Sequence, residues 1–209
     1  MASTENSARL CIRAAATVVA LTAAIGCARE AEEFICPDVA VGDLVVTELR
    51  GPQSSPNSLP QWIEIANVSD EDLDLEGLHL ALLRPDGSSS LDMIVRYKRP
   101  LAAGGYYVLG FVSDTMLANG VDYGLAGEHD GDLYEDGVLS LLACGETIDK
   151  VVYNDLPKAG TWSLGVSPPS ADGNDSELAW CVDATVAADG PATELGLPGT
   201  PGEVNRPCE

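Results

Sequence analysis

The sequence predicts an all-β fold, a sandwich or barrel of about nine short antiparallel strands. From Asp43 onward, apolar and polar residues alternate in short runs, which is the pattern of strands with one buried face. Gly, Pro, Asn and Asp separate these runs, and no segment has helical spacing. The 209 residues suffice for one domain with a buried core.

Each expected strand is an apolar run bounded by turn residues. In order, the runs are residues 44–49, 61–68, 78–84, 91–97, 106–111, 137–144, 147–153, 161–166 and 178–182. Pro-rich residues 51–60 separate the first two runs, the sequence RPDG at 84–87 separates the third and fourth, and AGG at 103–105 precedes the fifth. The short CGE at 144–146 predicts a hairpin between the sixth and seventh runs. Residues 184–209 lack alternation and are expected to run irregularly over the surface.

Charge excludes one class of partner. The chain has 33 acidic residues against 11 basic ones, a formal net charge of −22. It would repel the phosphates of nucleic acids and anionic lipid headgroups, so no nucleic-acid partner is expected. Cationic partners remain compatible with this composition.

The amino-terminal residues 1–26 are interpreted as a lipoprotein signal peptide. Arg9 and Arg13 precede the uncharged stretch 14–26, which is shorter than the about 20 apolar residues of a spanning helix. The sequence AIGC at 24–27 resembles the lipobox of bacterial lipoproteins, which implies lipidation of Cys27 and a lipid anchor in the membrane. Ordinary signal-peptide cleavage and a buried amino-terminal helix are the alternatives. Residues 27–41 would form a short acidic membrane tether.

Four further cysteines are expected to form two disulfides, because an even number in an exported chain favours oxidation. They are Cys36, Cys144, Cys181 and Cys208. Three pairings are open, and the favoured one joins Cys144 to Cys181 and Cys36 to Cys208, since the ends of a compact domain often lie close together. A zinc site is disfavoured because no CxxC spacing occurs.

Six segments resemble, in order, the motifs of lamin tail domains found in secreted and surface proteins of bacteria. They are GDLVVTEL at 42–49, QWIEIAN at 61–67, LDLEG at 73–77, LAAGGYYV at 101–108, WC at 180–181 and GTPGEVN at 199–205. The resemblance covers most of residues 42–208. It implies an immunoglobulin-like antiparallel β-sandwich that serves as an accessory or binding module.

No motif of an enzyme stands out. Ser163 lacks the G-x-S-x-G turn of a serine hydrolase, and the sequence holds no H-E-x-x-H, phosphate-binding loop or dinucleotide fingerprint. His79 lies within an apolar run, which favours a packed side chain, and His129 lies among acids in an expected loop. Glu64 shares a strand face with Trp62 and is interpreted as a hydrogen-bonded structural acid.

Two acidic clusters are candidate calcium loops, because Ca²⁺ takes six to eight oxygen ligands from flexible loops. The stronger candidate is residues 130–136, with Asp130, Asp132, Glu135 and Asp136; the other is 172–177, with Asp172, Asn174, Asp175 and Glu177. Neither has EF-hand spacing, and a solvated acidic loop is the alternative for both. No other cofactor is expected.

Taken together, these patterns predict a cell-envelope lipoprotein whose domain, residues 42–208, is a non-catalytic binding or structural module. The expected partners are the membrane, through the lipid anchor, and an envelope protein or polysaccharide that the sequence does not identify. The alternative is a hydrolase whose site is assembled from dispersed acids, with or without a metal.

Overall fold

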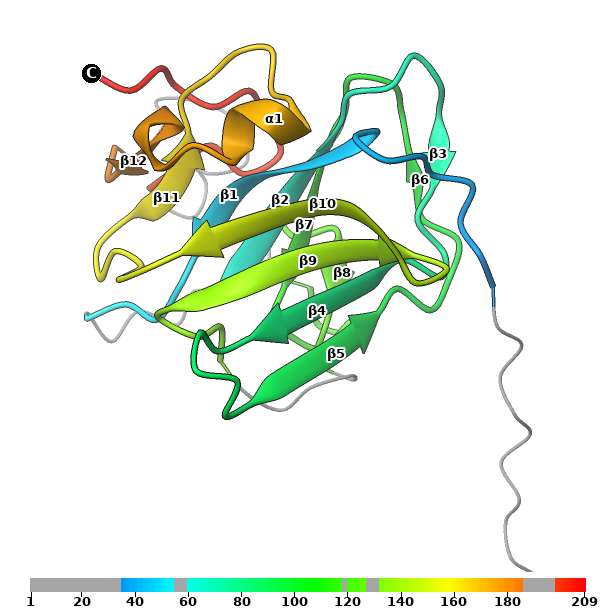
Figure 1. The fold of residues 1–209 in the computed structure, drawn as a ribbon, viewed down its shortest axis with the longest axis horizontal. Helices are drawn as coiled ribbons and strands as arrows, with labels where there is room; N and C mark the ends of the chain where they lie inside the picture. Colours follow the sequence, from blue (N-terminus) through cyan, green and yellow to red (C-terminus); the bar gives the residue numbers. More distant parts are fainter. Residues whose placement is uncertain (1–34, 55–59, 118–119, 127–131, 186–197) are drawn as a thin grey trace, which may run out of the picture. The chain divides into compact units, whose positions relative to one another are not determined.

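The computed structural model describes residues 35–54, 60–117, 120–126, 132–185 and 198–209, which all lie in one compact unit, residues 34–209 (Figure 1). The elements are β1 (Leu44–Arg50), β2 (Trp62–Asn67), β3 (Leu73–Asp74), β4 (His79–Leu83), β5 (Ser90–Ile94), β6 (Pro100–Leu101), β7 (Tyr106–Gly110), β8 (Tyr123–Gly124), β9 (Gly137–Ala143), β10 (Glu146–Tyr153), β11 (Thr161–Leu164), the helix α1 (Ala171–Asn174), the 3-10 helix η1 (Glu177–Ala179) and β12 (Trp180–Asp183). In the described residues no helix is long and apolar enough to cross a membrane.

All nine predicted strands are present, as β1, β2, β4, β5, β7, β9, β10, β11 and β12. The sequence did not reveal β3, β6 and β8, because each is only two residues long and too short to show alternation. It also missed α1 and η1. The helix α1 spans a single turn and is preceded by the N-cap residue Ser170, whose side chain accepts a hydrogen bond from the Gly173 amide, so it depends on a local cap.

The strands form two stacked layers. One sheet has the order β12-β11-β1-β2-β7-β8, and the other, in front of it in Figure 1, has the order β10-β9-β4-β5. A separate pair joins β3 and β6. The pairs are antiparallel with one exception, since β8 lies parallel to β7. The expectation of a purely antiparallel fold is therefore corrected at this edge, because the chain between β7 and β8 crosses over and β8 runs in the same direction as β7.

The main core lies between the two sheets. Ile63 and Ile65 of β2 belong to it, together with apolar residues of β4, β9 and β10. Trp62 and Glu64 point to the opposite face of the six-stranded sheet, as the alternation of β2 predicts. Both are nevertheless fully buried. The outer face of this sheet must therefore be covered by another part of the chain.

A β-bulge interrupts β1 at Thr47. Val46 pairs with Ile65 and Glu48 pairs with Glu64, so Thr47 is the extra residue. The Val46 amide beside this bulge donates to Asp149 of β10, at 2.8 Å. The Asn174 amide group donates to the same carboxylate oxygen, at 2.8 Å, which ties α1 to both sheets.

The predicted disulfide pairing is wrong, although all four cysteines do form disulfides. Cys36 bonds Cys144, and Cys181 bonds Cys208, with Cα separations of 5.4 and 5.7 Å. Cys144 lies in the turn between β9 and β10, next to the segment that enters β1, whereas Cys181 lies in edge strand β12 of the other sheet. The two ends of the domain are thus each fastened to a different sheet and not to one another.

Candidate functional site

Glu48 is the centre of a buried polar cluster on the outer face of the six-stranded sheet. Its Oε1 accepts a hydrogen bond from the Trp62 indole Nε1, at 3.1 Å. Its Oε2 accepts from the Ser163 hydroxyl at 3.0 Å and from the Thr200 amide at 3.1 Å. The side chain is fully buried. Both oxygens of this carboxylate are therefore occupied by donors of the protein itself.

Glu64 lies opposite Glu48 on the neighbouring strand. Its Oε1 accepts from the Thr47 hydroxyl at 2.7 Å, and its Oε2 accepts from the Gly202 amide at 2.6 Å. Because of the β-bulge, the consecutive residues Thr47 and Glu48 both contribute side chains to this face of the sheet. The interpretation of Glu64 as a hydrogen-bonded structural acid agrees with these contacts.

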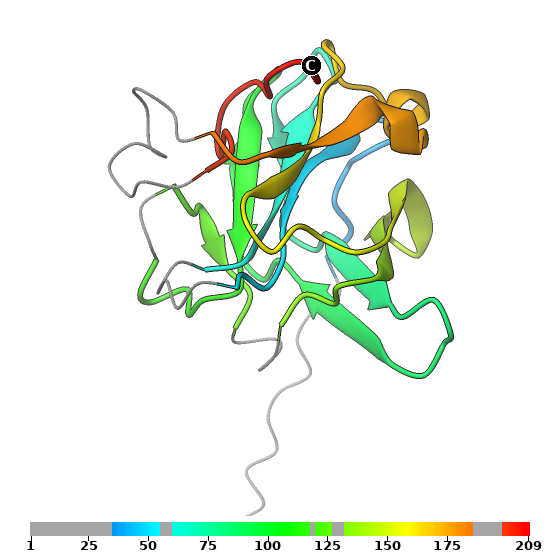
Figure 2. The ribbon, with the colours of Figure 1, turned by 90° about the vertical axis from the view of Figure 1, so that its left-hand side faces the viewer.

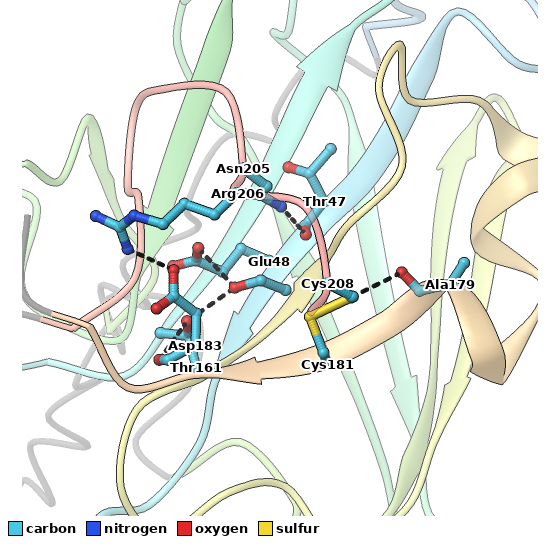
Figure 3. Close-up of a disulfide and its surroundings, with 10 residues drawn as sticks. Thr47, Glu48, Thr161, Ala179, Cys181, Asp183, Asn205, Arg206 and Cys208 are labelled. Atoms are coloured by element: carbon cyan, nitrogen blue, oxygen red, sulfur yellow. Dashed lines mark hydrogen bonds and ion pairs between the residues drawn. A yellow bond between two sulfur atoms is a disulfide. The ribbon is translucent and has the colours of Figure 1, made fainter.

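The carboxyl-terminal residues 198–209, which we call the C-terminal strap, cover the two glutamates. The strap is the red end of the ribbon in Figure 2, and Figure 3 shows its residues Asn205 and Arg206 beside Glu48. The Thr200 hydroxyl donates to the Asn205 side-chain oxygen, at 2.7 Å, and the Asn205 amide group donates to the Thr47 carbonyl, at 2.6 Å. Gly199 has a φ of +97°, and a Cβ there would collide with Glu48 and Thr161. The strap therefore needs glycine at this position.

Two further contacts hold the end of the strap against β12 (Figure 3). Arg206 donates to the Asp183 carboxylate at 2.6 Å and forms an ion pair with it. Two residues later, Cys208 is bonded to Cys181. A covalent bond, an ion pair and several buried hydrogen bonds thus keep the strap in place.

Burial raises the pKa of both glutamates. For Glu48 the desolvation of the charged form is opposed by the hydrogen bonds from Thr200, Ser163 and Trp62. For Glu64 desolvation is the largest cause, the charge of Glu48 adds to it, and the pKa lies well above its usual value. The pair can therefore hold a proton to a higher pH than an exposed glutamate can.

Arg50 is the cation of this cluster. It is fully buried, and its guanidinium carbon lies 5.0 Å from the centre of the Trp62 ring. None of its three side-chain nitrogens has a hydrogen-bond partner among the residues that the structure describes. Burial lowers its pKa, and the charge of Glu48 opposes this shift. Arg50 therefore compensates charge through space and through the indole ring, without a direct bond to either acid.

Chemically, the cluster can hold a proton on a buried carboxyl group, and it contains a hydroxyl, that of Ser163. Ser163 is 1% exposed, and its hydroxyl donates to Glu48. Among the described residues no imidazole contacts it. His79 lies on β4 of the other sheet, with its Nδ1 at 3.0 Å from Asp92, and His129 lies outside the described residues.

The predicted calcium loop is described only in part, since Asp130 lies outside the described residues. Asp132 accepts from the Gln61 side chain at 2.6 Å, and Asp136 accepts from the Asp155 amide at 2.6 Å. Glu135 forms an ion pair with Lys158. Within the described ranges no three acidic, histidine or cysteine side chains are grouped so as to hold a metal ion. The three described carboxylates each face a different protein partner.

The second acidic cluster, residues 172–177, forms α1 and the turn after it. Asn174 is buried, and its amide group donates to the Val46 carbonyl and to Asp149. Its role is therefore structural. Asp175 and Glu177 instead line a notch beside Trp162.

Other expectations lie outside the described residues. The signal peptide, residues 1–26, the lipidation site Cys27 and the first part of the tether are among them. Conversely, no sequence pattern assigned a role to Glu48, Thr200 or Asn205. The one signal that could have singled them out is their presence in the first and last of the six lamin-tail-like segments, which meet in this cluster.

Comparison with known proteins adds no assignment: neither a protein-family model nor a curated protein matches this chain.

Proposed function

We propose that this protein is a cell-envelope lipoprotein whose β-sandwich is a non-catalytic binding or structural module. One observation carries the proposal. Glu48 and Glu64, the two adjacent acids that come nearest to a catalytic pair, are fully buried beneath the C-terminal strap, and each of their oxygens accepts a hydrogen bond from the chain itself. Groups committed in this way stabilise a scaffold, and the scaffold would present its outer surfaces to partners.

The sandwich is further proposed to be immunoglobulin-like and related to lamin tail domains. The support is spatial. Thr47 and Glu48 come from the first resembling segment, Glu64 from the second, and Thr200 and Asn205 from the last, and these five residues join in one hydrogen-bond network. Because these segments contact one another in one buried cluster, a residue in one segment constrains the residues allowed in the others, which would keep the segments together as a set.

Export and anchoring belong to the same proposal. Two disulfides favour an oxidising compartment, because cytosolic thiols are kept reduced. The anchor would be lipid on Cys27, and several acyl chains would make membrane attachment stable. The partner would be an envelope protein or polysaccharide.

Fractionation and crosslinking test this function. The intact protein should fractionate with membranes, and Cys27→Ser should not. Crosslinking in intact envelopes should capture a partner, and this capture should not depend on Glu48 or Glu64. If Cys27→Ser fractionates with membranes like the parent protein, the lipoprotein assignment is wrong.

The rival, a hydrolase, is favoured by the adjacency of two acids with raised pKa values. It would require the strap to leave the sheet, since no substrate reaches a fully buried carboxyl. Hydrolysis of an ester or glycoside by the purified protein, lost in Glu64→Gln while the protein remains folded, would establish the rival and overturn the non-catalytic proposal.

A further inference from the structure

A notch opens at one side of the sandwich, between the end of β10 and the turn that joins α1 to η1. Its volume is about 190 Å³. The lining residues are Val152, Tyr153, Asn154, Trp162, Asp175 and Glu177. Its lining includes residues of β10, the edge strand of the four-stranded sheet, and Trp162 of β11 in the six-stranded sheet.

The aromatic wall of the notch is held firmly in place. Trp162 stacks on Trp180, with ring centres 4.2 Å apart and planes inclined by 12°. The Trp180 indole Nε1 donates to the Asn174 carbonyl, at 2.8 Å, which fixes the second ring to α1. The Tyr153 ring lies 6.4 Å from that of Trp162. A ligand would therefore meet a preorganised aromatic surface, which lowers the entropy cost of binding.

Exposed apolar residues neighbour the lining residues of the notch, either in the sequence or across a strand pair. Val182 pairs with Trp162 across β11 and β12 and is 58% exposed, and Val152, at the end of β10, is 56% exposed. Leu178, in η1, is 95% exposed, more than any other large hydrophobic residue in the described part of the chain. Apolar side chains gathered beside a pocket indicate an interaction surface, whereas single exposed ones do not.

The charge at the notch is negative and uncompensated. Asp175 and Glu177 line it, and neither forms an ion pair with any residue that the structure describes. The exposed Lys150, two residues before Val152 on β10, does not pair with them. A second copy of this chain or an anionic lipid would bring like charge to the notch. A cationic group would find carboxylates and an aromatic ring together.

We propose that this notch binds a lysine or arginine side chain of a protein partner, whose apolar residues pack on Val152, Leu178 and Val182. The inference rests on the proposed function as a binding module and names the chemistry of its partner. The cation would lie between Asp175 and Glu177 and against Trp162, so ion pairing and cation–π attraction would act on the same group. The apolar residues would provide most of the contact area.

The test uses the full-length protein and a synthetic peptide, acetyl-Leu-Lys-Leu-Lys-Leu-amide, titrated by calorimetry at low ionic strength. The double variant Asp175→Asn with Glu177→Gln should weaken binding about tenfold, as expected for the loss of two partly exposed ion pairs. The matched control, Asp38→Asn with Glu146→Gln, removes two exposed acids elsewhere and should change the dissociation constant by less than about twofold. Leu178→Ser should weaken binding severalfold without unfolding the protein, because the side chain is almost fully exposed.

Several results would overturn the inference. Equal weakening by the notch and control variants would show attraction to net charge alone, and equal binding of the peptide with Gln in place of Lys would show that no cation is recognised. A neutral oligosaccharide of N-acetylglucosamine is the third probe. If it displaces the peptide and binds equally well to the parent protein and to the double variant Asp175→Asn with Glu177→Gln, the notch is a polysaccharide site. The proposed function itself is tested separately, by the membrane fractionation of Cys27→Ser and by assays of hydrolysis, so its failure can be told apart from failure of this inference.

Discussion

The same substitution, Glu to Gln, should destabilise the protein at Glu48 but not at Glu64. Glu48 accepts hydrogen bonds from two N–H donors that cannot become acceptors, the Trp62 indole on Oε1 and the Thr200 amide on Oε2. Glutamine has one oxygen and one NH₂ group, so in Glu48→Gln one of these two donors must face another donor. Glu64 faces only one such donor, the Gly202 amide, because the Thr47 hydroxyl can rotate and accept from the new NH₂ group.

The magnitude follows from the number of donors left without a partner. One buried, unsatisfied N–H costs about 1–3 kcal/mol, so Glu48→Gln should lower the free energy of unfolding by about 2 kcal/mol. For a domain of this size that corresponds to a decrease of about 4–8 °C in melting temperature. In Glu64→Gln the Gly202 amide keeps its oxygen acceptor, so no backbone N–H is set against another donor, and a carboxyl whose charged form is penalised by burial is removed. The substitution should leave the stability at pH 7 unchanged or increase it.

Urea unfolding at pH 7, followed by tryptophan fluorescence and by far-UV circular dichroism, measures both variants against the parent protein. Coincident transitions for the two probes are required before the free energies are compared. If Glu48→Gln is no less stable than Glu64→Gln, then Glu48 does not accept from both N–H groups, and the assignment of this cluster is refuted.

Three further predictions concern the same scaffold. In the chain-entropy model, replacing both Cys181 and Cys208 with Ser should cost about 3.5 kcal/mol for a separation of 27 residues, and replacing both Cys36 and Cys144 should cost about 4.8 kcal/mol for 108 residues. Urea unfolding measures both, and peptide mapping without reduction checks the pairing; the reverse order of cost would contradict the loop-length reasoning. The buried glutamates have pKa values raised above the usual 4.5, so their protonated forms stabilise the fold fully below pH 4.5, and this contribution is lost as the pH rises through the folded-state pKa. Between pH 4.5 and 8, the free energy of unfolding should therefore fall less steeply with pH in Glu64→Gln than in the parent protein. Parallel curves for the two proteins would show that the Glu64 carboxyl is already ionised in this range. Finally, Gly199→Ala should destabilise the protein by at least about 1 kcal/mol, through its positive φ and its contact with Glu48; a melting temperature equal to that of the parent would mean that the strap does not need glycine there.

The sequence by itself determined the nine longer strands and, within a strand such as β2, which residues share the face that is buried in the main core. Alternation of side chains along a strand is a local property, so the residue pattern alone assigns Ile63 and Ile65 to one face and Trp62 and Glu64 to the other. Two-residue strands such as β3 and β8 carry no such periodic signal. They form where a neighbouring strand happens to offer free backbone groups.

Only the tertiary structure decided which residues distant in the sequence meet. Four cysteines allow three pairings with the same composition and spacing, and the choice depends on which sheet each end of the chain lies against. The cluster around Glu48 likewise needs Thr200, 152 residues further along the chain, to reach the outer face of the sheet. The sequence predicted residues 184–209 to be an irregular surface segment, which describes the path of the strap but not its role. That role arises because two carboxylates on neighbouring strands can be buried only where backbone amides from elsewhere in the chain satisfy them.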